Sequence, residues 1–386
     1  MSITILASAE GEVAAATARA SRWLLTSGIQ HPSGGCHAWF DARRGYQAFY
    51  PEVTGYYVTF AEWVADRTEE STARAAAERS AAWLAGLVDT AGGFPCLVPA
   101  DDATAREQTT TDASFLLKVA RRYTFDAGIA LQGLTASVRR TGSSDVRSAA
   151  RSLGDWLLEQ QTPDGTFTPF TGPQSWDSVA ADWSTRPGCH QAKVGIGLLA
   201  LAELESEPAF ADGATLAVRA GLAVQQSDGR FVTNPRTGAT NVHPHCYAAE
   251  ACWAVGTATG DEQLLAAARR ATRFLLDQSE PGQVFRRFSP DPSAGATAMR
   301  IDGLAQTLRL AVLTGVATDR ECAALARTLL THQEISEDPH TDGGFRFGFS
   351  SGGDPLPHVN VWVTAFAAQA LQLYAAEQVL DWRYLV

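Results

Sequence analysis

Histidines near the starts of apolar segments are the residues of this sequence best suited to proton transfer. Six of the eight histidines lie in or near such a start, or in a loop that leads to one. His243 and His245 begin one apolar segment, and His358 begins another. An imidazole titrates near neutral pH without a large change in its pKa, so it can remove or deliver a proton at a carbon atom. We therefore predict His243, His245 and His358 as acid/base groups.

Carboxylates occupy the starts of other apolar segments. Glu52, Asp126 and Asp302 lie within the first three residues of their segments. They can orient or assist the histidines, or supply the two carboxyl groups that glycoside cleavage uses. Asp also caps helix N-termini for stability alone, so capping is an equal alternative for Asp126 and Asp302.

Cations at the same positions need a different explanation. His, Arg and Lys are poor N-caps, and their charge is repelled by the positive end of the helix dipole. Arg300 and Lys193 are therefore predicted to clamp an anionic or hydroxyl-rich ligand, which helix N-termini also favour. The other predicted binding residues are His190, Glu250, Gln306, Asn360, Tyr56, Trp39 and Trp183.

A loop rich in Trp and Asp precedes His190. It runs from Trp176 to Trp183 and contains Asp177 and Asp182. Aromatic faces can stack on sugar rings. We predict that this loop is a lid over the ligand.

Two kinds of helical segment alternate along the chain and would position these residues. The first kind, such as 72–87 and 261–276, carries Arg and Glu on one face and apolar residues on the other, so it should face solvent. The second kind is apolar throughout and should line the interior. It covers 51–64, 126–138, 190–204, 243–258, 300–313 and 358–374.

A turn that follows each amphipathic segment repeats six times. Its clearest copies are Gln161 to Phe167 and Gln225 to Phe231, each with Asp-Gly before the aromatic. Glycine can take the positive φ that ends a helix, and the aromatic is expected to pack back on the completed hairpin. We expect these turns to be structural. The closing aromatics are Phe40, Phe94, Phe167, Phe231, Phe285 and Phe345, about 60 residues apart, which leaves room for two helices per repeat.

Six helical hairpins without a Pro/Ser-rich linker predict one all-α domain over residues 1–386. The predicted fold is an (α/α)6 toroid, with six parallel inner helices whose N-termini meet at one mouth. The polar residues described above would form a ring at that mouth.

Composition excludes several classes of partner. The formal net charge is -11 and no Lys/Arg cluster is present, which argues against nucleic acid and against an anionic membrane surface. No apolar run reaches the length of a membrane span, and the first residues lack a signal peptide pattern. Six cysteines without framework spacing indicate reduced thiols. We expect a cytoplasmic protein with a small-molecule substrate.

One segment resembles a family of sugar enzymes. Asn241-Val-His243-Pro-His245 followed by Glu250 resembles the Asn-x-His-x-His...Glu segment of the N-acylglucosamine 2-epimerase and mannose isomerase family, although the Glu falls two positions later here. This resemblance implies proton transfer on a sugar by paired histidines. The stretches around Tyr56 and from His358 to Trp362 resemble a bacterial group of toroid proteins tied to polysaccharide or sugar-metabolite biosynthesis, which implies no particular reaction.

Two further resemblances support alternative chemistries. The Gln-x-x-Asp-Gly-x-Phe turns resemble the repeats of squalene-hopene cyclases, but the Asp-x-Asp-Asp proton donor of those enzymes is missing. Cys36, Cys189, His190 and Cys246 could hold zinc, and Gly-Cys-His at Cys189 is similar to lanthionine-cyclase zinc sites, although the Gly after the His is absent. Buried cysteine is usually a small apolar residue, so we expect no metal and no other cofactor.

The sequence therefore predicts an epimerase or isomerase that acts on a sugar or uronate by His- and carboxylate-mediated proton transfer. Three alternatives remain. They are a glycoside hydrolase or lyase, a zinc-dependent or terpenoid-type cyclase, and a glycan-binding protein without catalysis.

Overall fold

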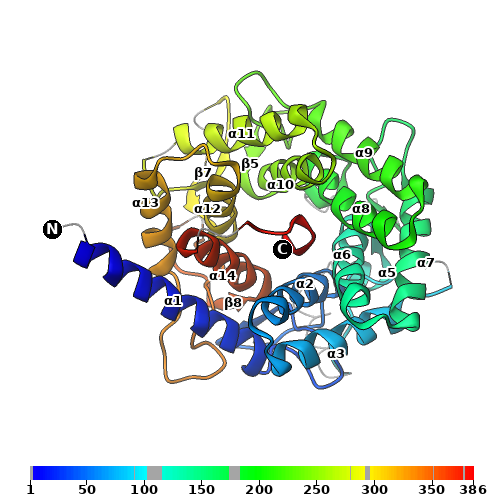
Figure 1. The fold of residues 1–386 in the computed structure, drawn as a ribbon, viewed down its shortest axis with the longest axis horizontal. Coiled ribbons are helices and arrows are strands. Elements are labelled where there is room, and N and C mark those ends of the chain that lie inside the picture. Colours follow the sequence, from blue (N-terminus) through cyan, green and yellow to red (C-terminus); the bar gives the residue numbers. More distant parts are fainter. Residues whose placement is uncertain are drawn as a thin grey trace.

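Two concentric rings of helices form the molecule (Figure 1). The computed structural model describes residues 3–90, 92–101, 115–173, 183–278, 280–291, 296–350, 352–376 and 379–386. The outer ring consists of α1 (Ile3–Thr26), α3 (Ser71–Leu87), α7 (Ser144–Gln160), α9 (Pro208–Leu222), α11 (Glu262–Asp277) and α13 (Asp319–Leu330). The inner ring consists of α2 (Pro51–Thr68), α6 (Thr124–Thr141), α8 (Val194–Glu205), α10 (Val242–Thr259), α12 (Ile301–Thr314) and α14 (Val361–Ala375). The predicted (α/α)6 toroid is confirmed.

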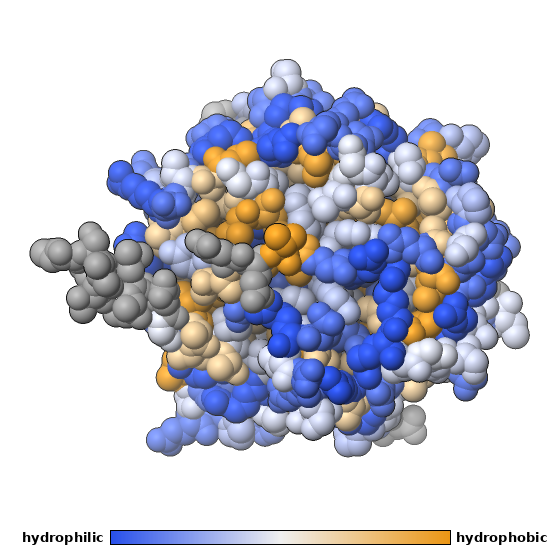
Figure 2. Space-filling model, in the orientation of Figure 1, coloured by the Kyte–Doolittle hydropathy of each residue, from blue (hydrophilic) through white to orange (hydrophobic). Residues whose placement is uncertain are grey.

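The inner and outer helices differ in burial as the two kinds of helical segment predicted. Every residue of α10 from Val242 to Gly256 is buried, whereas the buried residues of α11 form one stripe that includes Leu264, Ala268 and Leu275. Hydrophilic residues accordingly cover much of the outer rim (Figure 2). No helix in the described part of the chain is both long and apolar enough to cross a membrane.

The ring closes where the two ends of the chain meet. Helix α14 packs against both α1 and α2. Strand β1 (Trp39–Asp41) pairs antiparallel with β8 (His358–Asn360), with Trp39 opposite Asn360. These contacts place the first and last hairpins side by side (Figure 1).

Long connections lie at one mouth of the toroid and short turns at the other. Each connection from an outer helix to the next inner helix carries short elements, whereas an inner helix joins the next outer helix through only a few residues. The elements of the long connections are β2 (Gly45–Tyr46), α5 (Phe115–Ala120), β3 (Arg122–Tyr123), β4 (Phe170–Thr171), η1 (Trp183–Thr185), η2 (Cys189–Lys193), β5 (Thr240–Asn241), β6 (Phe285–Phe288) and β7 (Ala296–Met299). The N-termini of the inner helices therefore open toward the long-loop mouth.

The two rings also differ in how their helices begin. Ser143, Asp261 and Thr318 cap the outer helices α7, α11 and α13 with their side chains. The N-cap residues of the inner helices α6 and α12 are Tyr123 and Arg300, and neither makes a side-chain cap. The capping alternative for Asp126 and Asp302 is therefore wrong, because both residues lie inside the first turn.

In four repeats a glutamine joins the turn to the next outer helix. Gln225 Nε2 donates to the carbonyl of Gly229 within the turn (3.0 Å) and to that of Ala267 on α11 (2.9 Å). Gly229 has a φ of 95°, and a Cβ there would lie 2.3 Å from the Arg270 carbonyl oxygen. Only glycine fits such a close approach in the left-handed region. The glutamine and the glycine of the turn therefore contact the following outer helix.

The residue that closes the turn is hydrogen-bonded through its backbone NH to a side chain in, or just before, the following inner helix. The backbone NH of Phe231 donates to His245 Nδ1 (3.0 Å), and that of Phe167 donates to Gln191 Oε1 (3.2 Å). In the last repeat the backbone NH of Phe345 donates to Thr364 Oγ1 (2.9 Å). In the first repeat the equivalent donor is the NH of Cys36, which bonds Thr54. Cys36, and not Phe40, therefore closes the first turn.

The C-terminal segment fills the centre of the inner ring (Figure 1). It contains the short helix η4 (Trp382–Tyr384). Gln132 Nε2 on α6 donates to the carbonyl oxygens of Arg383 and Leu385 (3.0 and 2.8 Å). Arg383 pairs with Glu203 near the C-terminal end of α8, so the segment enters from the short-turn side.

Candidate active site

A cavity of about 270 Å³ lies at the long-loop mouth. Residues from the starts of several inner helices line it, including Tyr50, Glu52, Phe125, Asp126, His243, Tyr247, Arg300 and Trp362. A second cavity of about 240 Å³ shares His243 and Arg300 with it. A third, of about 310 Å³, contains His190 and shares Asn241 with the second. The predicted ring of polar residues thus exists in part, and it surrounds open space.

The cavity of about 270 Å³ is called the main cavity below, and His243 is the histidine that faces it. Its Nδ1 lies 2.7 Å from Gln306 Oε1 and 3.5 Å from an oxygen of Asp302. Burial, only partly opposed by the Asp302 carboxylate, lowers the pKa of His243 to about 4. The imidazole is therefore neutral at pH 7 and can accept a proton.

Gln306 determines which nitrogen of His243 carries the proton. The Gln306 Nε2 lies 3.2 and 3.3 Å from the two carboxylate oxygens of Glu250. An ionised carboxylate only accepts hydrogen bonds, so the amide nitrogen must face Glu250 and the amide oxygen must face His243. His243 then donates from Nδ1, and its Nε2 carries the lone pair that can act as a base.

Glu250 belongs to a fully buried ionic cluster beneath the cavity. Lys193 Nζ lies 2.7 Å from one oxygen of Glu250, and Arg309 pairs with the other. Burial alone would raise the pKa of Glu250, but the charges of Arg309 and Lys193 outweigh it and lower that pKa. Glu250 is therefore ionised, and it acts on His243 through Gln306 and through its own charge.

Lys193 does not act as the predicted anion clamp. Its side chain is 0% exposed, and besides Glu250 its Nζ donates to the carbonyl oxygen of Val386 (3.1 Å). The rings of Tyr56, Tyr247 and Phe366 also surround its ammonium group. Lys193, Glu250 and Tyr56 therefore support the site from below and do not line it.

Arg300 and Asp302 form an ion pair at the edge of the cavity. The guanidinium of Arg300 contacts both oxygens of Asp302, and Trp362 Nε1 donates to the same carboxylate (3.3 Å). Burial would raise the pKa of Asp302, but Arg300 and His243 outweigh it and lower that pKa. Arg300 also lies 4.4 Å above the Phe347 ring. Asp302 is thus an ionised group that holds Arg300 beside His243.

Glu52 and Asp126 form a second ionisable pair, and both line the main cavity. Burial raises the pKa of Glu52 to about 7, although a hydrogen bond with Tyr50 and the charge of Lys193 oppose this. Burial and the neighbouring Glu52 raise the pKa of Asp126 well above its usual value. In the described part of the chain, Asp126 Oδ2 is buried without a hydrogen-bond partner. One or both carboxyl groups are therefore protonated at neutral pH and can donate a proton.

The structure places His245 and His358 away from this cavity. His245 is fully buried, and it bonds the NH of Phe231 through Nδ1 and the carbonyl of Ala271 through Nε2 (3.1 Å). Both ring nitrogens are thus used by the backbone, so the geometry contradicts the predicted acid/base role. His358 bonds Asn360 (2.7 Å), and its ring packs between Phe347 and Trp39.

Other predicted residues lie beside the main cavity or outside the described residues. His190 lines the third cavity, and burial lowers its pKa to about 3. The Trp183 side chain and the predicted lid residues from Trp176 to Asp182 fall outside the described residues.

The described residues contain no group of three or more His, Cys, Asp or Glu side chains that could hold a metal ion. Burial raises the pKa of the Cys36 and Cys189 thiols to about 12 each.

Several lining residues were missed by the sequence reasoning. Tyr50 is the N-cap of α2, and Trp362 is the second residue of α14. Arg286 and Arg287 line the second cavity from β6. Two adjacent arginines do not mark a site by themselves, because the same pair also occurs at Arg121-Arg122 and at Arg269-Arg270.

Comparisons with known proteins establish the class of fold. The chain is similar in structure to a sugar epimerase from a ruminal bacterium, with a TM-score of 0.74, 10% identity and coverage of 96% of this chain and 98% of that one. It is also similar to a D-mannose isomerase (TM-score 0.67, 11% identity, 97% of each chain). An unsaturated glucuronyl hydrolase specific for heparin matches with a TM-score of 0.69, 10% identity, and coverage of 95% and 97%.

These structures show that the chain has the (α/α)6 toroid fold found in carbohydrate-active enzymes. No family model matches the sequence, and no match was found among curated proteins.

Proposed function

We propose that this protein is a sugar epimerase or isomerase that transfers a proton within the main cavity. The observation that carries the proposal is the pairing of a base with an acid around one space. His243 is a neutral imidazole with its lone pair on Nε2, while the Glu52 and Asp126 pair retains a proton near neutral pH. The two kinds of group line the same cavity.

This arrangement suits proton transfer next to a sugar carbonyl. His243 Nε2 removes the proton from the carbon beside the carbonyl, and the electron pair of the broken C–H bond forms an enediolate. The Glu52 and Asp126 pair returns a proton to the opposite face of the same carbon for epimerisation, or to the former carbonyl carbon for isomerisation. In isomerisation the hydroxyl proton of the first carbon also moves to the former carbonyl oxygen, so that the new carbonyl forms. Exchange with water then removes the proton from His243 and returns one to the carboxyl pair. The similar folds of a sugar epimerase and a mannose isomerase support this choice.

The test is deuterium exchange into a panel of aldoses, ketoses and uronates in D₂O, followed by NMR. We expect carbon-bound deuterium in the substrate, and a loss of ~10²-fold or more for His243→Gln, as is typical when a general base is removed. His332→Gln is the matched control, because His332 is half-buried and contacts Phe349 outside these cavities. Equal exchange rates in the two variants would contradict the assignment of His243.

Glycoside hydrolysis is a second candidate, favoured by the two carboxyl groups in one cavity. One would act as acid and the other as base or nucleophile. The fold is also similar to that of an unsaturated glucuronyl hydrolase. New reducing ends without carbon-bound deuterium would favour hydrolysis. Sugar binding by the wild type without turnover of any kind, and with an affinity that His243→Gln leaves unaltered, would favour a glycan-binding protein.

A further inference from the structure

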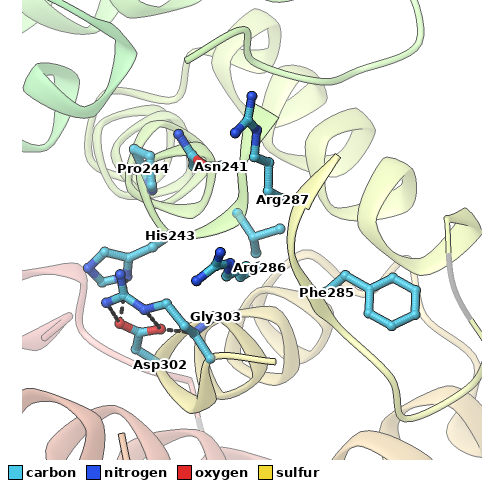
Figure 3. A pocket seen from close by; sticks show the side chains of 10 residues that line it. Asn241, His243, Pro244, Phe285, Arg286, Arg287, Asp302 and Gly303 are labelled. Carbon is cyan, nitrogen blue, oxygen red and sulfur yellow. Dashed lines mark hydrogen bonds and ion pairs between the residues drawn. The ribbon is translucent and has the colours of Figure 1, made fainter. Parts of the chain in front are cut away.

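Three arginines gather around the second cavity, which adjoins the proposed reaction site. Arg286, Arg287 and Arg300 line it together with Asp302 and His243. Figure 3 shows the side chain of Arg286 extending toward His243 and Asp302, and that of Arg287 ending near Asn241. The chain as a whole has a net charge of -11, so a cluster of cations here is unlike the rest of the molecule.

The charges of this cluster do not balance within the described residues. Arg300 is neutralised by Asp302. Arg286 and Arg287 form no ion pair with any residue that the structure describes, whereas Arg140, Arg273 and Arg309 each do.

One nitrogen of the Arg287 side chain also lacks a hydrogen-bond partner among the described residues. This nitrogen is Nε, which is buried. Arg286 is exposed and Arg287 is only partly buried, but a buried Nε–H without a partner is costly. Adjacent like charges raise that cost, and an anion bound between them would remove it.

The backbone beneath the two arginines is held in place by a sheet. Strand β6 lies between β5 and β7, and Arg287 is paired with Asn241 at the start of α10. The guanidinium groups are thus attached to a strand that pairs with β5, and β5 leads directly to the helix of His243. This geometry suits recognition of a ligand at a fixed distance from the base.

We infer that this cavity is an anion subsite that binds the carboxylate or phosphate group of the sugar substrate. The inference rests on the proposed function, because it names the substrate as an anionic sugar. A guanidinium matches carboxylate and phosphate oxygens through two parallel hydrogen bonds. His243 and Arg300 line both cavities, so a sugar ring in the main cavity can extend an anionic substituent to Arg286 and Arg287.

The experiment measures binding by calorimetry with glucuronate, glucose 6-phosphate, glucose and inorganic phosphate at low and high salt. We expect a charged sugar to bind at least ~10-fold more tightly than glucose, since one charge-assisted hydrogen bond contributes about that factor. This advantage should weaken in high salt. The relative affinities of glucuronate and glucose 6-phosphate identify which anion fits.

Variants separate the subsite from a general effect of charge. The double variant Arg286→Gln/Arg287→Gln should lose the preference for the charged sugar, whereas Arg287→Lys should retain part of it. Arg269→Gln is the matched control, because Arg269 lies exposed on α11 and pairs with Glu262. Equal affinities for glucose and the charged sugars, or an unchanged preference in the double variant, would overturn the inference.

The outcomes also distinguish this inference from the proposed function. Deuterium exchange that is equally fast for glucose and for the charged sugars, and that is unchanged in the double variant, would reject the anion subsite and keep the epimerase. Arginine-dependent binding of a charged sugar without exchange or isomerisation would keep the subsite and reject the epimerase.

Discussion

Gln306 accepts a hydrogen bond from His243 at 2.7 Å while it donates to the buried carboxylate of Glu250. This relationship connects the proposed base to an ionic cluster to which Lys193 on a third inner segment contributes. The cluster fixes the amide orientation of Gln306, and the amide fixes the tautomer of His243. The proposed base is therefore oriented by residues that do not line the cavity.

Gln306→Met should reduce kcat by at least ~10-fold, because it removes the acceptor that holds the tautomer of His243. The Gln306 hydrogen bond raises the pKa of His243, so its loss should move the acidic limb of the kcat profile to lower pH. Gln369→Met is the matched control, since Gln369 is equally buried but bonds the Tyr384 carbonyl and Arg309. If both variants shifted the profile alike, Gln306 would have only a structural role.

Glu52→Gln should stabilise the folded protein at pH 8 while it reduces turnover. The folded-state pKa of Glu52 is raised from 4.5 to about 7, so the folded state binds more protons than the unfolded state between these values. The contribution of Glu52 to the free energy of unfolding therefore falls as the pH rises from 4.5 to about 7. Each tenfold change in proton affinity corresponds to ~1.4 kcal/mol, and we expect a gain of at least that size at pH 8.

The measurement is the midpoint of urea unfolding at pH 4, 6 and 8 for wild type and Glu52→Gln. The difference between them should grow with pH. Glu78→Gln is the control, because Glu78 is an exposed carboxylate on α3. A difference independent of pH would show that the carboxyl group of Glu52 has an ordinary pKa.

Lys193→Met should destabilise the fold by about 3–5 kcal/mol, since it leaves part of a buried charge cluster uncompensated. The variant would also lose the bond to the Val386 carbonyl. Denaturant unfolding measures the change, and Lys118→Met controls for loss of the only other lysine. A raised KM with unchanged stability would instead support the anion-clamp role that the sequence predicted.

His245 should be replaceable by Gln with little loss of turnover, because Gln191 makes the equivalent bond to the turn at Phe167. His245→Leu should cost about 1–3 kcal/mol, since it leaves the buried NH of Phe231 without an acceptor. Hydrogen exchange at that NH should speed up in His245→Leu more than in His245→Gln. Loss of kcat in a folded His245→Gln protein would instead support the catalytic role predicted for His245.

The sequence by itself determined the toroid. Helical periodicity and a glycine that needs a positive φ are local signals that recur in six copies, and a glutamine accompanies them in most copies. Together they specify six hairpins. The same signals predicted that inner helices begin at one mouth, which placed His243, Glu52, Asp126, Arg300 and Asp302 around one opening. No local signal distinguished a side chain that faces the cavity from one that faces the next helix.

That distinction was decided only by the tertiary structure. Residues two apart on a helix point about 200° apart, so His243 faces the cavity while His245 faces the outer ring. Lys193 and Glu250 look like ligand-binding residues until the ring brings them together from segments 57 positions apart. Likewise, Arg286 and Arg287 become part of a site only because β6 pairs beside the start of α10.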